Sequence, residues 1–176
     1  MGMSPDQQLE SPAHTAYCFS AEDLHDTARL GAALATVLPP GTTVALVGTL
    51  GAGKTNLVQA IATASGIPDG TVTSPTFVLC QPHEGTRTLY HLDAYRLKDE
   101  DEFLELGPEE YFESDGLTLI EWADRVEGCL PDQRVEIRIE VTGEQSRQFQ
   151  IIPVGARYQS ILGPLRQILE KAADLG

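Results

Sequence analysis

Residues 48–55 read Gly48-Thr49-Leu50-Gly51-Ala52-Gly53-Lys54-Thr55. Glycine lacks a Cβ, so this stretch can turn tightly and bring backbone N–H groups close to phosphate oxygens. Lys54 is placed to reach the β and γ phosphates, and Thr55 offers a hydroxyl to Mg²⁺. The octapeptide therefore predicts a P-loop, in which all eight residues surround the phosphates of a nucleotide.

The segments on either side have the order that a P-loop requires. Residues 42–47 form a continuous apolar and β-branched run, which is typical of a strand covered on both faces. After the loop, apolar residues keep a helical period until Gly66-Ile67-Pro68 ends it. We therefore expect the α/β class, with a P-loop NTPase-type three-layer fold and a mixed, mostly parallel central sheet.

The remaining elements are predicted from periodicity and turn residues. Ser20, with Asp23 three residues later, resembles a helix start, and Pro39-Pro40-Gly41 ends that helix. Strands are expected at 77–81, 88–93, 117–121, 134–142 and 148–153, short acidic amphipathic helices within 97–113, and a closing helix at 158–175. Residues 1–15 are rich in polar residues and proline, so we expect a disordered tail before a single P-loop ATPase domain at 16–176.

The net charge of the chain indicates which kinds of partner it can bind. Twelve Lys and Arg against 26 Asp and Glu give a net charge of −14, which repels a phosphate backbone. We therefore expect no direct DNA binding and no strong RNA binding; the acidity serves either solubility or a basic protein partner. The sequence has no apolar run near the ~18 residues of a membrane span and no signal-peptide pattern at its start, so we expect no membrane contact and a cytoplasmic location.

Cysteine and histidine do not form a metal-binding pattern. The three cysteines stand far apart without Cys-x-x-Cys spacing, and the four histidines are scattered. We expect free thiols and assign no metal to these residues.

Two acids are candidates for the carboxylate that a P-loop enzyme needs at the end of a neighbouring strand. Asp93 follows the run Leu89-Tyr90-His91-Leu92, and Glu121 follows Leu117-Thr118-Leu119-Ile120. Such strand-end acids are also common as plain solvated residues, so the sequence alone leaves their roles open. The Asn-Lys-x-Asp and Thr-Lys-x-Asp segments that read guanine are absent from the sequence, which favours ATP over GTP.

Four ordered motifs resemble one family. They are Leu50-Gly51-Ala52-Gly53-Lys54-Thr55, Ser74-Pro75-Thr76-Phe77, His91-Leu92-Asp93-Ala94-Tyr95-Arg96-Leu97 and Ile120-Glu121-Trp122. Together they resemble the TsaE (YjeE) family, the small ATPases of bacterial tRNA threonylcarbamoyladenosine synthesis. One departure is Thr49, where the family usually has Asp.

The resemblance implies roles for particular residues. Thr55 and Glu121 would hold Mg²⁺, Asp93 would be needed for hydrolysis, and residues 74–77 would be a switch segment. Thr76 could present its hydroxyl toward the γ phosphate, although Ser-Pro-Thr is also an ordinary turn. The catalytic set expected is therefore Asp93, Glu121 and Thr76.

The sequence leaves three further positions open. Trp122 either packs in the core or contacts nucleotide or partner, and Arg96 either reaches a phosphate or pairs with an acid. Adenine contacts are expected around residues 19–27, with Thr27 as a candidate. The chain beyond Pro131 carries no motif that maps onto a role.

The expected function is a Mg²⁺-dependent ATPase, slow alone, that acts with the TsaB-type and TsaD-type proteins implied by the resemblance and contacts tRNA only through them. The alternative is a small-molecule kinase of the P-loop class. A kinase usually needs an Arg-rich lid, whereas the chain after Thr55 is acidic. A nucleotide-binding module without turnover is disfavoured by Asp93 and Glu121.

Overall fold

The computed structural model describes residues 15–73 and 80–173, and within them a seven-stranded mixed sheet. The strands are β1 (Tyr17–Ala21), β2 (Thr43–Gly48), β3 (Cys80–His83), β4 (Leu89–Asp93), β5 (Leu117–Glu121), β6 (Arg134–Val141) and β7 (Arg147–Val154). Their order is β1-β7-β6-β2-β5-β4-β3. The central strands β6, β2, β5 and β4 are parallel to one another, whereas β3 pairs antiparallel with β4, β7 with β6, and β1 with β7.

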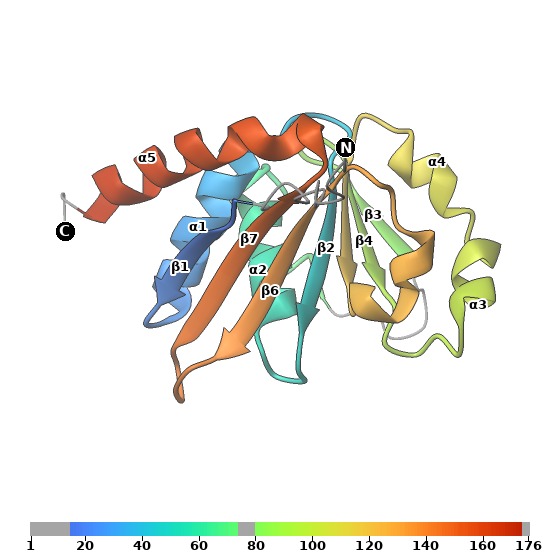
Figure 1. Ribbon diagram of the computed structural model, residues 1–176, viewed down its shortest axis with the longest axis horizontal. Helices are drawn as coiled ribbons and strands as arrows, with labels where there is room; N and C mark the ends of the chain where they lie inside the picture. The colour runs from blue at the N-terminus through green and yellow to red at the C-terminus, as the bar shows by residue number, and fades with distance from the viewer. Residues whose placement is uncertain (1–14, 74–79, 174–176) are drawn as a thin grey trace, which may run out of the picture.

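Helices cover both faces of this sheet (Figure 1). They are α1 (Leu24–Val37), α2 (Lys54–Ala64), α3 (Glu100–Glu105), α4 (Pro108–Phe112) and α5 (Leu162–Ala173), with 3₁₀ helices η1 (Ala123–Cys129) and η2 (Ala156–Ile161). The larger core lies between the sheet and α1, α2 and α5. A smaller core lies between the sheet and α3, α4 and η1, so the predicted three-layer α/β fold is confirmed.

Strand β2 shows why the run before the P-loop is apolar throughout. Val44 and Leu46 belong to the larger core, and Ala45 belongs to the smaller one. Because β2 lies between β5 and β6 and both of its faces are covered, alternation between apolar and polar residues is not needed. The strand therefore delivers the P-loop from the middle of the sheet.

The start of α1 differs from the prediction. Ser20 lies in β1, where it pairs with Gln148, and the helix cap is Asp23, whose side chain accepts a hydrogen bond from the Asp26 N–H. Asp23 has the extended backbone of an N-cap, so the helix begins at Leu24. The predicted end at Pro39-Pro40 is confirmed, since the helix finishes at Val37.

Most other predicted elements are confirmed with small shifts of their ends. The structure places β5 at the predicted residues, and α3 and α4 lie in the acidic segment. The closing helix begins instead as the 3₁₀ turn η2, which leads into α5. Strand β1 was not predicted. The tail prediction falls almost wholly on residues outside those described, as does most of the predicted strand at 77–81.

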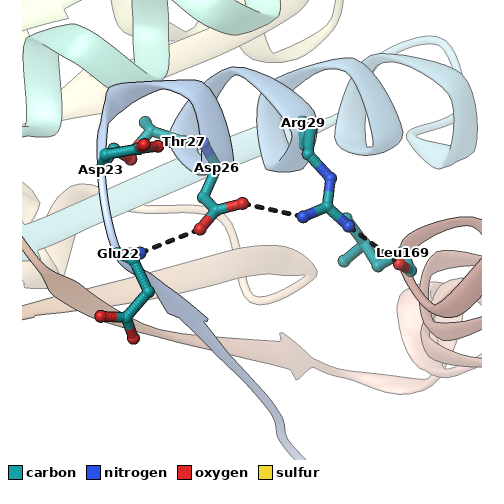
Figure 2. Close-up of polar contacts among 6 residues, drawn as sticks. All are labelled: Glu22, Asp23, Asp26, Thr27, Arg29 and Leu169. Carbon is teal, nitrogen blue, oxygen red and sulfur yellow. Dashed lines mark hydrogen bonds and ion pairs between the residues drawn. The ribbon is translucent and has the colours of Figure 1, made fainter. Parts of the chain in front are cut away.

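Two charged residues fasten α1 to its surroundings, as Figure 2 shows. Asp26 accepts the Glu22 N–H at 3.0 Å and an Arg29 N–H at 2.8 Å, and Arg29 also donates to the carbonyl of Leu169 on α5 at 3.1 Å. The β1–α1 corner is thereby joined to α5. Among the described helices, none combines the length and apolar character needed to cross a membrane.

Candidate functional site

The P-loop joins the end of β2 to the start of α2. A Cβ on Gly48 would lie 2.8 Å from the carbonyl oxygen of Ile139 on the neighbouring strand, so only glycine fits the sheet there. Gly51 and Gly53 have φ of +76° and +102°, a backbone conformation that residues with a side chain rarely adopt. The sequence pattern of the loop thus follows from both its turn and its packing.

Lys54 is the first residue of α2 and is only 4% exposed. Its Nζ donates to the carbonyls of Gly48 at 2.6 Å and Thr49 at 2.9 Å, and lies 3.8 Å from the centroid of the Trp122 ring. Burial lowers the pKa of Lys54, while the nearby carboxylates, Glu121 foremost, oppose that shift. A buried ammonium therefore lies at the loop, held by two of the loop's own carbonyls.

Thr55 and Glu121 meet beside Lys54. The Thr55 hydroxyl donates to the carboxylate, 2.8 Å from Oε1 and 3.0 Å from Oε2, and His91 Nε2 lies 2.8 Å from Oε1. Glu121 is 3% exposed and His91 is fully buried. A hydroxyl and a carboxylate are the hard oxygen ligands that Mg²⁺ prefers, so these residues fit the predicted metal pair.

Asp93 lies next to Glu121 because the two are paired in the parallel ladder of β4 and β5. Asp93 accepts the Tyr95 N–H at 2.9 Å. Burial raises the pKa of Asp93, the charge of Glu121 adds to that rise, and the Tyr95 hydrogen bond opposes it. A half-buried second carboxylate beside the predicted metal ligand is suited to orient an attacking water.

These residues line a cavity of about 340 Å³ on the sheet's carboxyl edge. Its lining is Leu50, Gly51, Gly53, Lys54, Thr55, Asn56, Asp93, Tyr95, Arg96, Glu121 and Trp122. The structure therefore brings together Lys54, Thr55, Asp93 and Glu121 as predicted. Gly48 and Thr49 contribute carbonyls to Lys54, while Ala52 is buried below the loop. Thr76 and the switch segment lie outside the described residues.

Trp122 belongs to the site as well as bordering the smaller core. It is the one residue other than glycine with positive φ among those described, at +58°, and its ring lies 4.8 Å from that of Tyr95, centroid to centroid. This backbone turn directs the chain from β5 into η1 and leaves the indole facing Lys54. The reading of Trp122 as a site residue is thus favoured over pure core packing.

A second cavity, of about 530 Å³, adjoins the loop on the α1 side. Its lining is Asp23, Leu24, His25, Thr27, Gly53, Asn56, Glu144, Gln145, Arg147 and Phe149. Gly53 and Asn56 line both cavities. The predicted adenine region around residues 19–27 therefore borders the P-loop, and Thr27 is among its lining residues.

Sequence reasoning missed two residues that shape the site. His91 lies within a motif, but its contact with Glu121 depends on the pairing of β4 with β5. Arg147 begins β7 and donates to the carbonyls of Ala52 at 3.0 Å and Gly51 at 3.3 Å. No sequence pattern identifies this arginine, because its partners in the loop are backbone carbonyls, which every residue type carries.

Comparison with known proteins agrees with this arrangement. The sequence model of the family described as Threonylcarbamoyl adenosine biosynthesis protein TsaE matches residues 21–149. Curated TsaE proteins of Bacillus subtilis and Treponema pallidum are 40% and 39% identical to the chain, covering 80% and 72% of it and 85% and 93% of their own lengths. The crystal structure of Bacillus subtilis YdiB superimposes with a TM-score of 0.75 at 29% identity, covering 89% of this chain and 98% of that one.

Proposed function

The chain belongs to the TsaE family of tRNA threonylcarbamoyladenosine biosynthesis, and on that premise we propose that it is a Mg²⁺-dependent ATPase. The observation that carries the proposal is the contact of Thr55 with Glu121 beside Lys54. It joins the phosphate-binding loop to a strand-end carboxylate, which is the pairing that P-loop hydrolases use.

The polyphosphate would bind across the loop and the start of α2. Backbone N–H groups and the positive end of the helix dipole favour the phosphates there. Lys54 would exchange the carbonyls of Gly48 and Thr49 for phosphate oxygens. This exchange replaces neutral acceptors with charged ones, which strengthens each hydrogen bond.

Thr55 and Glu121 would hold Mg²⁺, which when bound neutralises charge on the β and γ phosphates. His91 keeps Oε1 of Glu121 engaged from the buried side, so the orientation of the carboxylate is fixed before the ion arrives. Asp93 lies next to Glu121 in the ladder and would orient the attacking water. Glu121 would thus bind the metal, and Asp93 would act on the attacking water.

The adenosine half of ATP would occupy the second cavity. That cavity shares Gly53 and Asn56 with the phosphate cavity and is bordered by the apolar side chains of Leu24 and Phe149. Because a purine ring is flat and largely apolar on its faces, such a mixed cavity suits it. Thr27 remains the candidate polar contact.

Partners of the TsaB and TsaD type complete the proposed role. Among the described residues that line the two cavities, Arg96 and Arg147 are the arginines, and Arg147 is engaged with the loop's own carbonyls. A group supplied in trans can raise the rate of a P-loop hydrolase by 10³ to 10⁵. We therefore expect slow hydrolysis alone, stimulation by partners, tRNA contact through those partners, and action in the cytoplasm.

Reconstitution tests the proposal. ATP hydrolysis and threonylcarbamoyl transfer to tRNA are measured with partners present, with this protein omitted or replaced by the Lys54→Ala variant. We expect multiple-turnover modification only with the intact protein. Sustained modification in the omission sample would refute the role, and rapid phosphate transfer to a metabolite by this protein alone would indicate a kinase instead.

A further inference from the structure

Arg147 makes an unusual set of contacts between two segments that are distant in the sequence. Its Nε donates to the carbonyl of Ala52 at 3.0 Å and its Nη2 to that of Gly51 at 3.3 Å. On its other side, Nη1 lies within hydrogen-bond distance of three carbonyls of its own hairpin, those of Gly143, Glu144 and Ser146, at 3.1, 3.4 and 2.8 Å. The guanidinium therefore ties the β6–β7 hairpin to the P-loop through backbone oxygens.

Because peptides are planar, the contacts of Arg147 with the loop's carbonyls also fix the orientation of the loop's N–H groups. A trans peptide is planar, so its C=O and the N–H of the next residue point in opposite directions. Holding the Gly51 carbonyl fixes the Ala52 N–H, which donates to Thr49 at 3.1 Å and closes the loop's turn. Holding the Ala52 carbonyl fixes the Gly53 N–H on the opposite side of that peptide.

We propose that Arg147 is a positioning residue that preorganises the P-loop for polyphosphate binding: by holding the carbonyls of Gly51 and Ala52 outward, it keeps the Ala52 N–H closing the turn and the Gly53 N–H facing the ligand. This rests on the proposed function only in taking a polyphosphate as the ligand. A loop held in its binding conformation loses less freedom on binding, so the affinity is greater. The glycines of the loop make such support necessary, because they allow many other backbone conformations.

The proposal predicts a characteristic pattern of losses. The loop amides serve the phosphates common to ATP, ADP and inorganic pyrophosphate, so replacing Arg147 weakens all three by a similar factor. Arg147→Gln should raise each Kd about tenfold, which corresponds to about 1.4 kcal/mol. Arg147→Lys keeps the charge, but its single nitrogen cannot serve both segments as a guanidinium fork does, so it should restore little of the affinity.

Arg87→Gln is the matched control. Arg87 also donates to backbone carbonyls, those of Leu38 at 2.7 Å and 2.9 Å and of Ala35 at 3.3 Å, where α1 ends. It lines neither cavity. Its loss should lower the melting temperature without changing the three dissociation constants, which separates loop positioning from general stability.

The experiment combines titration calorimetry with hydrogen exchange of the ligand-free chain. Calorimetry of ATP, ADP and pyrophosphate is carried out on the wild type and the three variants, each below its melting temperature. Hydrogen exchange should show faster exchange of the peptide covering residues 48–56 in both Arg147 variants and not in Arg87→Gln. In the ATPase assay, KM should rise about tenfold for Arg147→Gln while kcat changes much less.

Three results would overturn the proposal. Full affinity in Arg147→Lys would mean that the charge acts directly on the ligand. A loss confined to ATP and to kcat would make Arg147 a transition-state group, and a loss that spares pyrophosphate would make it a contact of the nucleoside. Pyrophosphate binding and exchange do not require hydrolysis, so absence of ATPase activity in the wild type would refute the proposed function and leave this test intact.

Discussion

The hydroxyl of Thr55 lies 2.8 Å from Oε1 of Glu121, although the two residues are 66 positions apart in the chain. The contact joins the first turn of α2 to the end of β5, and it forms because β5 lies next to β2 in the sheet. A carboxylate that is 3% exposed is thereby kept beside the P-loop by a hydroxyl and by His91. This arrangement decides which substitutions should affect metal binding and which should affect turnover.

Replacing either member of this pair should weaken the Mg²⁺ dependence of ATP binding. Glu121→Gln keeps the shape but removes the charge, and Thr55→Ala removes the hydroxyl. We expect the tightening of ATP binding by Mg²⁺ to fall about tenfold or more in each, since a hydrogen bond or ligand to a charged group contributes about 1.5–3 kcal/mol. Calorimetry of ATP with Mg²⁺ and with EDTA measures the effect.

Thr36→Ala is the control for Thr55→Ala, because the Thr36 hydroxyl donates to the carbonyl of Ala32 on the exposed side of α1. It should leave the Mg²⁺ dependence unchanged. An unaltered Mg²⁺ effect in Glu121→Gln would remove Glu121 from the ligand set and make Asp93 the better candidate.

Asp93→Asn should lower turnover while sparing nucleotide binding. If Asp93 orients or deprotonates the attacking water, its loss should reduce kcat by about 10²-fold or more, with the Kd for ADP nearly unchanged. Because burial raises the pKa of this carboxyl, the neutral amide should not lower the melting temperature. Asp132→Asn, at an exposed position, is the control, and loss of ADP binding in Asp93→Asn would exchange the roles of the two acids.

Local sequence patterns are enough to predict the central part of the fold. The P-loop and β5 are read from consecutive residues, so the sequence alone predicts where both lie. Strand β1 is missed because it is only five residues long, it ends in Ala21, a residue type depleted in strands, and Ser20 resembles a helix cap. Its pairing with β7, far away in the sequence, decides its conformation.

The residues of the site likewise include some that the sequence predicts and some that only the fold brings into place. Lys54 and Thr55 follow from the motif, and Asp93 and Glu121 from their positions at strand ends. The contact of Arg147 with the P-loop could not be predicted, because the two loop carbonyls are 95 and 96 residues away and any residue type could supply them. The position of Trp122 against Lys54 likewise depends on a left-handed backbone turn that alternation along a strand does not predict.

Asp26→Asn should destabilise the chain at neutral pH and less so in acid. The hydrogen bond from the Glu22 N–H lowers the pKa of Asp26; burial opposes this, and the hydrogen bond and charge of Arg29 lower the pKa further. A carboxyl whose pKa is lowered on folding stabilises the protein above its unfolded value of about 3.9 and loses that effect as the pH falls through the lowered value. We expect a loss of about 1 kcal/mol at neutral pH.

Urea unfolding of Asp26→Asn and of the wild type over a pH series tests this, with the difference shrinking below about pH 4. Glu140→Gln, at an exposed position, serves as the control. A difference that stays constant down to the lowest pH would show that the side chain's charge is not involved.

Lys54→Met should lose most affinity for ATP and ADP. It removes the ammonium that we propose binds the phosphates, while keeping an unbranched apolar side chain at the buried position. Charge-assisted hydrogen bonds are stronger than neutral ones, so we expect at least about a tenfold rise in Kd. Calorimetry provides the measurement, circular dichroism checks the fold, and unchanged ATP binding would refute the assignment.

Trp122 should report the movement of Lys54. It is the only tryptophan in the sequence, so the indole emission of the protein comes from this residue. In the structure the ammonium lies 3.8 Å from the ring centroid and is held by two loop carbonyls. A polyphosphate that attracts Lys54 would withdraw the charge from the ring and change the emission.

Inorganic pyrophosphate should produce most of the change that ATP produces, because it engages Lys54 and has no base to stack. In Lys54→Met the emission of the ligand-free protein should already differ from that of the wild type, and pyrophosphate should change it little. If ATP changes the emission and saturating pyrophosphate does not, the ring responds to the nucleoside, and the link between Lys54 and Trp122 is wrong.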